Sequence, residues 1–445
     1  MSKYYKISLI AIILASLVFL PGAICKTPQA KPKEITLEVW NLFDDSDAFR
    51  DIIADYKLAN ANITIKYYKK DYAGYEDLIL NSMAEGDGPD IFLINSQWVE
   101  KYMRKIVSMS QNIPSAEEVP KPFKKIGISD IEKDFADVVY DDVISDGKIY
   151  ALPLSVDTLA LYYNKDMFNN AGVPKPPTDW TDFKDVVRKL REVDEKSNII
   201  KAGAAMGTAQ NISRSSDLLM LLMAQTGTPM VGGNGSLASF DQMIASGENM
   251  ISPGANALKF YTDFANSAHS FYTWNPKMES SIDVFAQEKC AMIFGYSYLE
   301  DEIKKKQPYG LNFSAAKIPQ IKNSAEEINF ANYWVFAVSR LSKSPNAAWD
   351  FVKFLTSRTE AEKYLTATKK PTALRDLILS QTQSDDPILK TFAGQVLTAR
   401  SWPQKDSAAM EKIFMDMIDD VNYGRRSAEE ALKYGASRAT QVLGE

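Results

Sequence analysis

Hydrophobic and polar residues alternate in the first part of the chain that has the pattern of a folded domain. The run ITLEVW at 35–40 alternates with a period of two, which predicts a β-strand. Apolar residues then recur at helical spacing between Ser46 or Asp47, as the N-terminal cap, and Asn60. A strand, a helix and a buried strand are predicted to follow at 62–68, 75–85 and 91–94. This order is typical of a parallel sheet covered by helices, so we expect an α/β fold.

The middle and the end of the chain continue with mixed elements. Helices are predicted at 180–193, 215–225 and 256–266, and strands at 159–164, 290–295 and 334–338. The Gly-rich stretch 227–236 predicts a turn or hairpin. Its glycines do not lead from a strand into a helix with the spacing of a phosphate-binding loop, which argues against a nucleotide site. From residue 344 onward the pattern is largely helical, with breaks near Pro371 and at 401–406.

The N-terminal segment has the pattern of an export signal. Two lysines precede the apolar run 7–20, which is short for a membrane span of roughly 20 residues. We expect residues 1–25 to be a cleaved signal peptide, a signal lipidated at Cys25, or a retained anchor. A large Ile24 stands where bacterial lipoproteins normally have a small residue. Each alternative places the rest of the chain outside the cytoplasm, after a flexible tether at 26–33.

Composition narrows the chemistry. The 445 residues are 45% hydrophobic and 24% charged, as in soluble globular proteins of two or three domains. A net charge of −6 without a long basic run argues against a nucleic-acid partner. His269 is the only histidine, which disfavours zinc sites and Ser-His-Asp catalysis. Beyond Cys25 only Cys290 remains, so we expect a buried thiol, no intrachain disulfide, no metal and no cofactor.

Six separated stretches together resemble a known family, the extracellular solute-binding proteins of bacterial ABC importers of the maltose-binding-like type. The resemblance covers nearly all of the chain after the export signal. Its pieces are LEVWNLFDD at 37–45, EGDGPDIFL at 85–93, DGKIYALPLSVDTLALYYNKDMF at 146–168, PPTDWTDF at 176–183, SIDVFAQEKCAMIFGYSY at 281–298 and ANYWVFAVSRLSKSPNAAWDFVKFLTS at 331–357.

The resemblance implies a two-lobe periplasmic-binding-protein-like fold of type II, with a ligand cleft between lobes and a hinge crossed several times. The first lobe would comprise 34–153 plus 319–356, and the second 157–315 plus 357–445. The hinges would lie near 153–156, 318–319 and 356–361. Such a protein is a monomer and not an enzyme. It captures a small ligand, here a sugar or oligosaccharide, by hinge closure and delivers it to membrane permease subunits.

The ends of two predicted strands carry residues suited to a sugar, which offers apolar faces and a rim of hydroxyls. Trp40, Asp44 and Asp45 follow the first strand, where open parallel sheets bind their ligands. Gln97 and Trp98 follow the strand at 91–94 in the same way. Alternatively, these residues belong to the core or cap the next helix.

Further binding residues are implied by the resemblance. Asp157 breaks the apolar stretch after the first hinge and is the strongest polar candidate. The other candidates follow strands or lie on loops that reach the ligand in relatives. They are Gln210, Tyr296, Tyr298, Tyr333, Trp334 and Trp402, with Asn211 and Trp274 as less certain additions. Packing in the core is the alternative for each aromatic residue.

Two other functions stay open at this stage. A glycan-active hydrolase would use Asp44 and Asp157 as its carboxylate pair, although no hydrolase motif is visible. A surface adhesin would use the same fold to bind a protein. Among ligands, acids and aromatic rings at the candidate positions favour neutral sugars, or a cation held by Asp44, Asp45 and Asp157, over phosphate.

Overall fold

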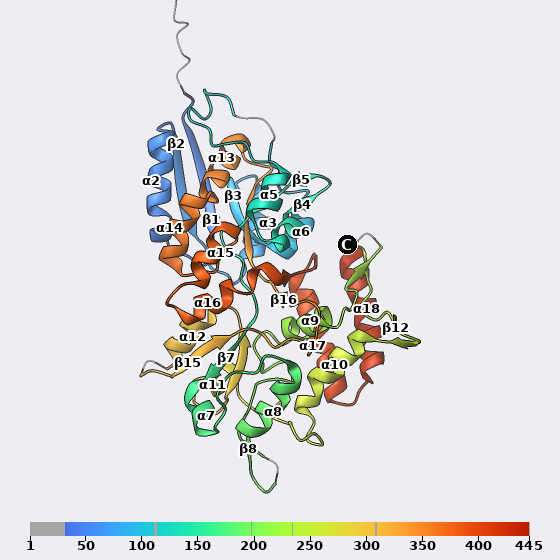
Figure 1. The fold of residues 1–445 in the computed structure, drawn as a ribbon. Helices are drawn as coiled ribbons and strands as arrows, with labels where there is room; N and C mark the ends of the chain where they lie inside the picture. The colour runs from blue at the N-terminus through green and yellow to red at the C-terminus, as the bar shows by residue number, and fades with distance from the viewer. Residues whose placement is uncertain (1–31, 111–113, 197, 234, 308, 445) are drawn as a thin grey trace, which may run out of the picture.

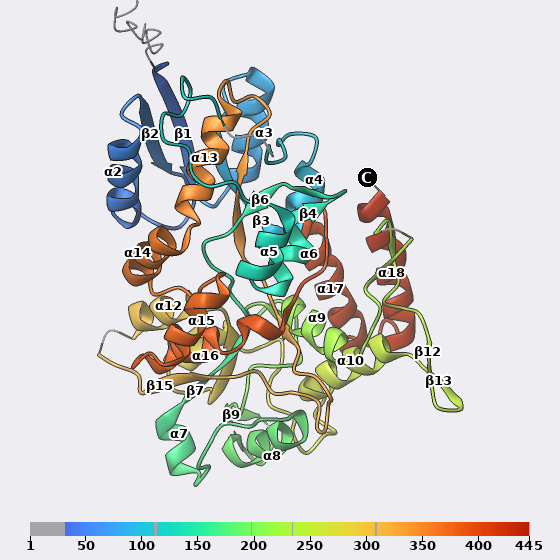
Figure 2. The ribbon, with the colours of Figure 1, turned by 45° about the horizontal axis from the view of Figure 1, so that its top comes forward.

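The computed structural model describes residues 32–110, 114–196, 198–233, 235–307 and 309–444. The expected export signal and most of the tether lie outside these residues. Figures 1 and 2 show two parts, one built around β1, β2 and β3 and the other around β7 and β15, with the C-terminal helices α17 and α18 beside the second. In the described part of the chain, no helix combines the length and the apolar character needed to cross a membrane.

A five-stranded sheet forms the centre of the first part, in the order β2-β1-β3-β17-β6. Its strands are β1 Ile35–Asn41, β2 Ile63–Lys69, β3 Ile91–Asn95, β17 Trp334–Val338 and β6 Ala151–Leu152. β1 lies parallel to β2 and β3, whereas β17 is antiparallel to β3 and to β6. The alternation predicted for the first strand is confirmed, because Ile35, Leu37 and Val39 are buried in the core.

The second part contains the smaller antiparallel sheet β14-β7-β15 and a large helical layer. Its strands are β7 Ala160–Asn164, β14 Met292–Gly295 and β15 Phe313–Ala316. Its main helices are α8 Trp180–Leu190, α9 Ser215–Gln225, α10 Pro253–Thr262, α17 Ser407–Asn422 and α18 Ala428–Gly444. Cys290 is fully buried here, as expected, and burial raises the pKa of its thiol to about 12.

The remaining elements are short or cover the larger sheet. The helices are η1 Ser46–Phe49, α2 Arg50–Ala59, α3 Tyr75–Glu85, η2 Ser96–Trp98, α4 Val99–Tyr102, α5 Ile128–Asp134, α6 Asp137–Val143, α7 Lys165–Asn170, η3 Asp263–Ala265, α11 Ser281–Ala286, α12 Leu299–Lys306, α13 Pro345–Leu355, α14 Arg358–Thr368, α15 Arg375–Thr382, α16 Pro387–Ala393 and η4 Val396–Thr398. The strand pairs are β4 Ile144–Ser145 with β5 Lys148–Ile149, β8 Glu192–Val193 with β9 Ile199–Lys201, β10 Val231–Gly232 with β11 Leu237–Ala238, β12 Ile244–Ser246 with β13 Asn249–Ile251, and β16 Asn329–Phe330 with β18 Ala399–Arg400.

Local patterns predicted most elements, and the differences have local causes. The helices expected at 75–85 and 215–225 have these bounds in the structure, and β10 and β11 form the expected hairpin. The helix expected from Ser46 begins instead with a 3₁₀ turn, and α2 follows without a side-chain cap. α8 ends at Leu190, because Glu192 and Val193 pair with β9. α10 begins early, because Ser252 caps it and Pro253 occupies its first turn.

Among the residues that the structure describes, three clusters of buried apolar side chains form the core, and the chain passes between them several times. The first surrounds the five-stranded sheet, and the other two surround the smaller sheet and the helical layer. Val156 belongs to the first cluster and Leu159 to the second, which agrees with a crossing near 153–156. The next crossing lies between Phe330 and Ala331, later than the expected hinge at 318–319.

The packing also differs from the expected lobes after residue 356. Tyr364 and Leu365 of α14 and Leu377 and Ile378 of α15 belong to the first cluster. α14 contacts α2 and η1, so its apolar face is buried against the first part. The assignment of all residues from 357 onward to the second lobe is therefore wrong for these two helices. The rest of the two-lobe division stays a prediction.

Candidate functional site

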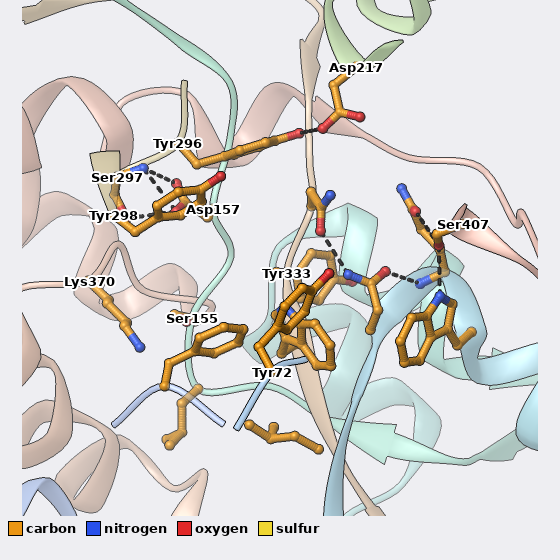
Figure 3. Close-up of a pocket in the computed structure, with 18 of the residues that line it drawn as sticks. Tyr72, Ser155, Asp157, Asp217, Tyr296, Ser297, Tyr298, Tyr333, Lys370 and Ser407 are labelled. Atoms are coloured by element: carbon orange, nitrogen blue, oxygen red, sulfur yellow. Dashed lines mark hydrogen bonds between the residues drawn. The ribbon is translucent and has the colours of Figure 1, made fainter. Parts of the chain in front are cut away.

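A cavity of about 540 Å³ lies between the first and second clusters. The carboxyl ends of β1 and β3 contribute one side of it, and the loop after β14 and the start of α9 contribute the other. This is the position at which parallel sheets present their ligand-binding residues. Figure 3 shows side chains from both parts facing one another across this space.

Aromatic rings form much of the wall on the side of the first part. Trp334 lies edge-on to Phe43 at 5.3 Å between ring centroids and to Trp98 at 5.4 Å. Tyr72 lies 6.1 Å from both Phe43 and Trp334. Phe43 and Tyr72 are exposed although they are large and apolar, so this cluster offers flat surfaces to a ligand.

A basic group, a carboxylate and a tyrosine hydroxyl meet on the same side. Lys370 Nζ lies 2.7 and 2.8 Å from the two carboxylate oxygens of Asp44. The hydroxyl of Tyr364 donates to Asp44 Oδ2 at 2.7 Å. Asp44 therefore lines the cavity as expected, but as one half of an ion pair rather than as a free carboxylate.

A similar group of a basic side chain, a carboxylate and a tyrosine hydroxyl lies on the opposite side of the cavity. Arg214 donates through Nε and Nη2 to Asp217 Oδ2 at 2.9 and 2.5 Å, and Tyr296 donates its hydroxyl to the same oxygen at 2.5 Å. Arg214 has φ 59°, a left-handed conformation that costs energy for a residue with a side chain. Arg214 forms an ion pair with the buried Asp217 and lines the cavity.

Asp157 lines the cavity just after the first crossing. Its carboxylate accepts hydrogen bonds from the backbone N–H of Ser297 at 3.0 Å, the Ser297 hydroxyl at 2.7 Å and the N–H of Thr158 at 2.9 Å. Burial disfavours the anion and outweighs these bonds, which raises the pKa of Asp157 to about 6. Figure 3 shows Tyr298 beside this carboxylate.

One hydroxyl connects the two parts beside the cavity. Ser407, the first residue of α17, accepts from Trp98 Nε1 at 2.7 Å, and its hydroxyl donates to Gln97 Oε1 at 3.2 Å. Trp98 packs against the first cluster, whereas Met410 and Ile413 of α17 belong to the second. The bond therefore links elements of different cores (Figure 3).

The cavity brings together most of the residues expected at the site. Those that line it are Asp44, Gln97, Trp98, Asp157, Tyr296, Tyr298, Tyr333 and Trp334. Tyr333 is almost fully buried, and its hydroxyl donates to Asp142 Oδ2 at 2.7 Å.

Other expected residues do not line the cavity. Trp40 is 7% exposed in the first core cluster: it lies on the face of β1 opposite Ile35, Leu37 and Val39, and this face is also covered at the end of the strand. Asp45 is exposed and pairs with Lys69 at 2.9 Å. Gln210 is exposed and donates to Asp419.

The C-terminal tryptophan is the largest departure from the expected site. Trp402 is 5% exposed, and its Nε1 donates to the sulfur of Met220 at 3.1 Å. Its ring lies 6.1 Å from that of Phe414, within the second core cluster. The less certain Asn211 and Trp274 are also absent from the cavity wall.

Sequence reasoning missed several lining residues. Phe43 had a signal, because it follows β1 within the stretch that carries Asp44. Tyr72, Arg214, Lys370 and Ser407 had none, since each reaches the cavity from a loop or a helix start. In the described ranges, no cluster of three or more His, Cys, Asp or Glu side chains could hold a metal ion.

The sequence matches the model of a known protein family. The family model described as "Bacterial extracellular solute-binding protein" matches residues 42–362. The galactooligosaccharide-binding protein of Bacillus subtilis is 22% identical over 420 residues, which cover 92% of this chain and 90% of that protein. The maltodextrin-binding protein of the same organism is 29% identical over 326 residues, which cover 70% of each chain.

Solved structures share the fold. The cyclic alpha-maltosyl-1,6-maltose binding protein of Arthrobacter globiformis superimposes with a TM-score of 0.72 at 19% identity, over 92% of this chain and 99% of that one. The expected α/β fold of type II is therefore confirmed, as is the family resemblance. The chain belongs to the bacterial extracellular solute-binding protein family.

Proposed function

We propose that the chain is the solute-binding component of an ABC importer and captures a sugar or oligosaccharide in the cavity. The observation that carries this proposal is the cavity wall, in which exposed aromatic faces stand beside ion-paired carboxylates. Aromatic faces suit the C–H surface of a pyranose ring, and paired donors and acceptors suit its hydroxyls. The printed names of the relatives, which concern galactooligosaccharides and maltodextrins, support the same class of ligand.

Closure of the two parts over the ligand would complete the site. The Lys370, Asp44 and Tyr364 group lies on the first part, and the Arg214, Asp217 and Tyr296 group faces it from the second. A ligand held between these groups stabilises the closed form, which a membrane permease then recognises. The protein would act outside the cytoplasm, with an N-terminus that is cleaved, lipidated at Cys25 or retained as an anchor. Its partner there would be the permease of the importer.

Isothermal titration calorimetry with mono- to hexasaccharides of varied linkage tests this function directly. We expect saturable binding of at least one saccharide with a negative heat-capacity change, because apolar surface is buried. Chromatography of the saccharide after incubation should show no shortened product, since Asp44 and Asp157 act as binding groups. If no saccharide binds the folded protein, the proposal fails, and product formation would favour the hydrolase instead.

A further inference from the structure

The charged side chains that line the cavity are mostly paired with one another. The basic groups among them are Lys370 and Arg214. Lys370 is bound by Asp44, and Arg214 is bound by Asp217 and lies 3.9 Å from Glu411. A ligand therefore meets no basic side chain on this wall that is without a carboxylate partner.

Asp157 is the exception among the carboxylates of the wall. Within the described part of the chain, no Lys, Arg or His nitrogen lies within 4.0 Å of its oxygens. Its hydrogen-bond donors, which belong to Ser297 and Thr158, are all neutral. Every hydrogen bond to the Asp157 carboxylate therefore comes from a neutral donor, and Lys370 acts on its charge only from beyond ion-pair distance, beside a cavity that Asp157 lines.

The surroundings of Asp157 favour positive charge. Tyr298 lies beside the carboxylate in Figure 3, and its ring stacks on that of Tyr296 at 6.2 Å. Aromatic faces attract cations, most strongly where water is excluded. Burial leaves the Asp157 anion poorly solvated, which raises its pKa, so a cation at this position would be stabilised.

We propose that the site selects saccharides by charge: it prefers an amino sugar whose ammonium group lies at Asp157 and rejects acidic sugars. The inference rests on the proposed saccharide-binding function. An ammonium group would form a charge-assisted hydrogen bond with the one carboxylate that has no basic partner. A uronate or sugar phosphate would meet only basic groups that already hold carboxylates, in a wall that carries more acids than bases.

The test compares matched ligands by calorimetry at pH 7. Each neutral saccharide that binds is paired with counterparts in which one hydroxyl is replaced by an amine, an N-acetyl group or, at C6, a carboxylate. We expect at least one amine to bind about tenfold tighter than its parent, and the carboxylate to bind at least tenfold weaker. Neutral binding without this discrimination overturns the inference alone, and absence of all saccharide binding overturns the proposed function as well.

Variants assign the preference to one carboxylate. Asp157→Asn should reduce the ratio of amine to parent affinity to about 1. Asp45→Asn is the matched control, because it makes the same charge change at an exposed residue that pairs with Lys69 away from the cavity wall. Thermal unfolding checks that both variants are folded. An unchanged ratio in Asp157→Asn, or an equal loss in Asp45→Asn, contradicts the assignment.

A pH series on the wild-type protein also tests whether the Asp157 carboxylate causes the preference for amines. Lowering the pH from 7 to 5 protonates Asp157, whose pKa is about 6, while the ligand amine stays charged. The amine preference should therefore fall toward 1 at pH 5. Lys370, Tyr162 and Tyr298 face Asp157, and burial raises the pKa of both tyrosines, away from this range. A preference that is constant over this range overturns the proposal.

Discussion

Replacing Ser407 with alanine should weaken ligand binding, because its hydroxyl joins the two parts beside the cavity. The substitution removes the oxygen that accepts from Trp98 Nε1 at 2.7 Å and donates to Gln97 Oε1 at 3.2 Å. Trp98 packs against the first core cluster and α17 belongs to the second, so both bonds cross between the two parts. If the parts separate when the site is empty, these bonds exist only in the closed form.

The size of the effect follows from the two hydrogen bonds. Each contributes about 0.5–1.5 kcal/mol net, so the closed form loses about 1–3 kcal/mol. Because ligand binding must then supply this energy, the dissociation constant should rise about 5- to 150-fold. The free energy of unfolding should change less, since each part keeps its own core.

Calorimetry with the tightest-binding saccharide measures the change in affinity, and small-angle X-ray scattering measures compaction on ligand addition. Ser236→Ala is the matched control, because its hydroxyl donates to Gly233 within one turn at 2.7 Å. We expect the control to bind like the wild type. The reasoning is refuted if Ser407→Ala binds within twofold of the wild type and shows the same compaction, since the bonds would then not depend on closure.

Three further substitutions test the roles of individual side chains in ligand binding, in core packing and in the pH dependence of stability. Trp334→Ala should weaken saccharide binding about 10- to 100-fold in calorimetry with little change in melting temperature, because its half-buried ring lies in the aromatic wall; a loss confined to stability would contradict this. Trp402→Ala should instead destabilise the fold by about 3–5 kcal/mol in urea unfolding, since its ring fills the second core; unchanged stability would argue against its burial. Burial raises the pKa of Asp142 to about 6, above its unfolded value of about 4, so its contribution to stability is complete below pH 4 and is lost as the pH rises through 6. Asp142→Asn should remove this loss and raise the melting temperature above pH 6, with no difference from the wild type near pH 4; a variant that is less stable at pH 7 than the wild type would refute this sign.

Local sequence patterns predicted the elements because their causes are local. α3 was predictable from helical spacing and β1 from its alternation, since burial of one face dictates which residues are apolar. α9 is instead buried on all sides over residues 215–223, and its continuous apolar run indicated the helix. The strand ends were also predictable as ligand positions, and Asp44 and Gln97 do line the cavity. Even there, Trp40 is buried in the first core cluster although it lies on the face of β1 opposite Ile35, Leu37 and Val39.

The sequence by itself therefore determined the α/β class, the family resemblance and part of the binding wall. Only the tertiary structure decided which side chains meet. Lys370 reaches Asp44 across 326 residues and Ser407 reaches Gln97 across 310, and no local pattern encodes such pairs. The same holds for Trp402, whose burial depends on Met220 and α17, and for Asp157, which lacks a basic partner because the fold gives Lys370 to Asp44. Contacts between segments distant in sequence depend on how the two parts of the molecule are joined, and that is a property of the folded chain.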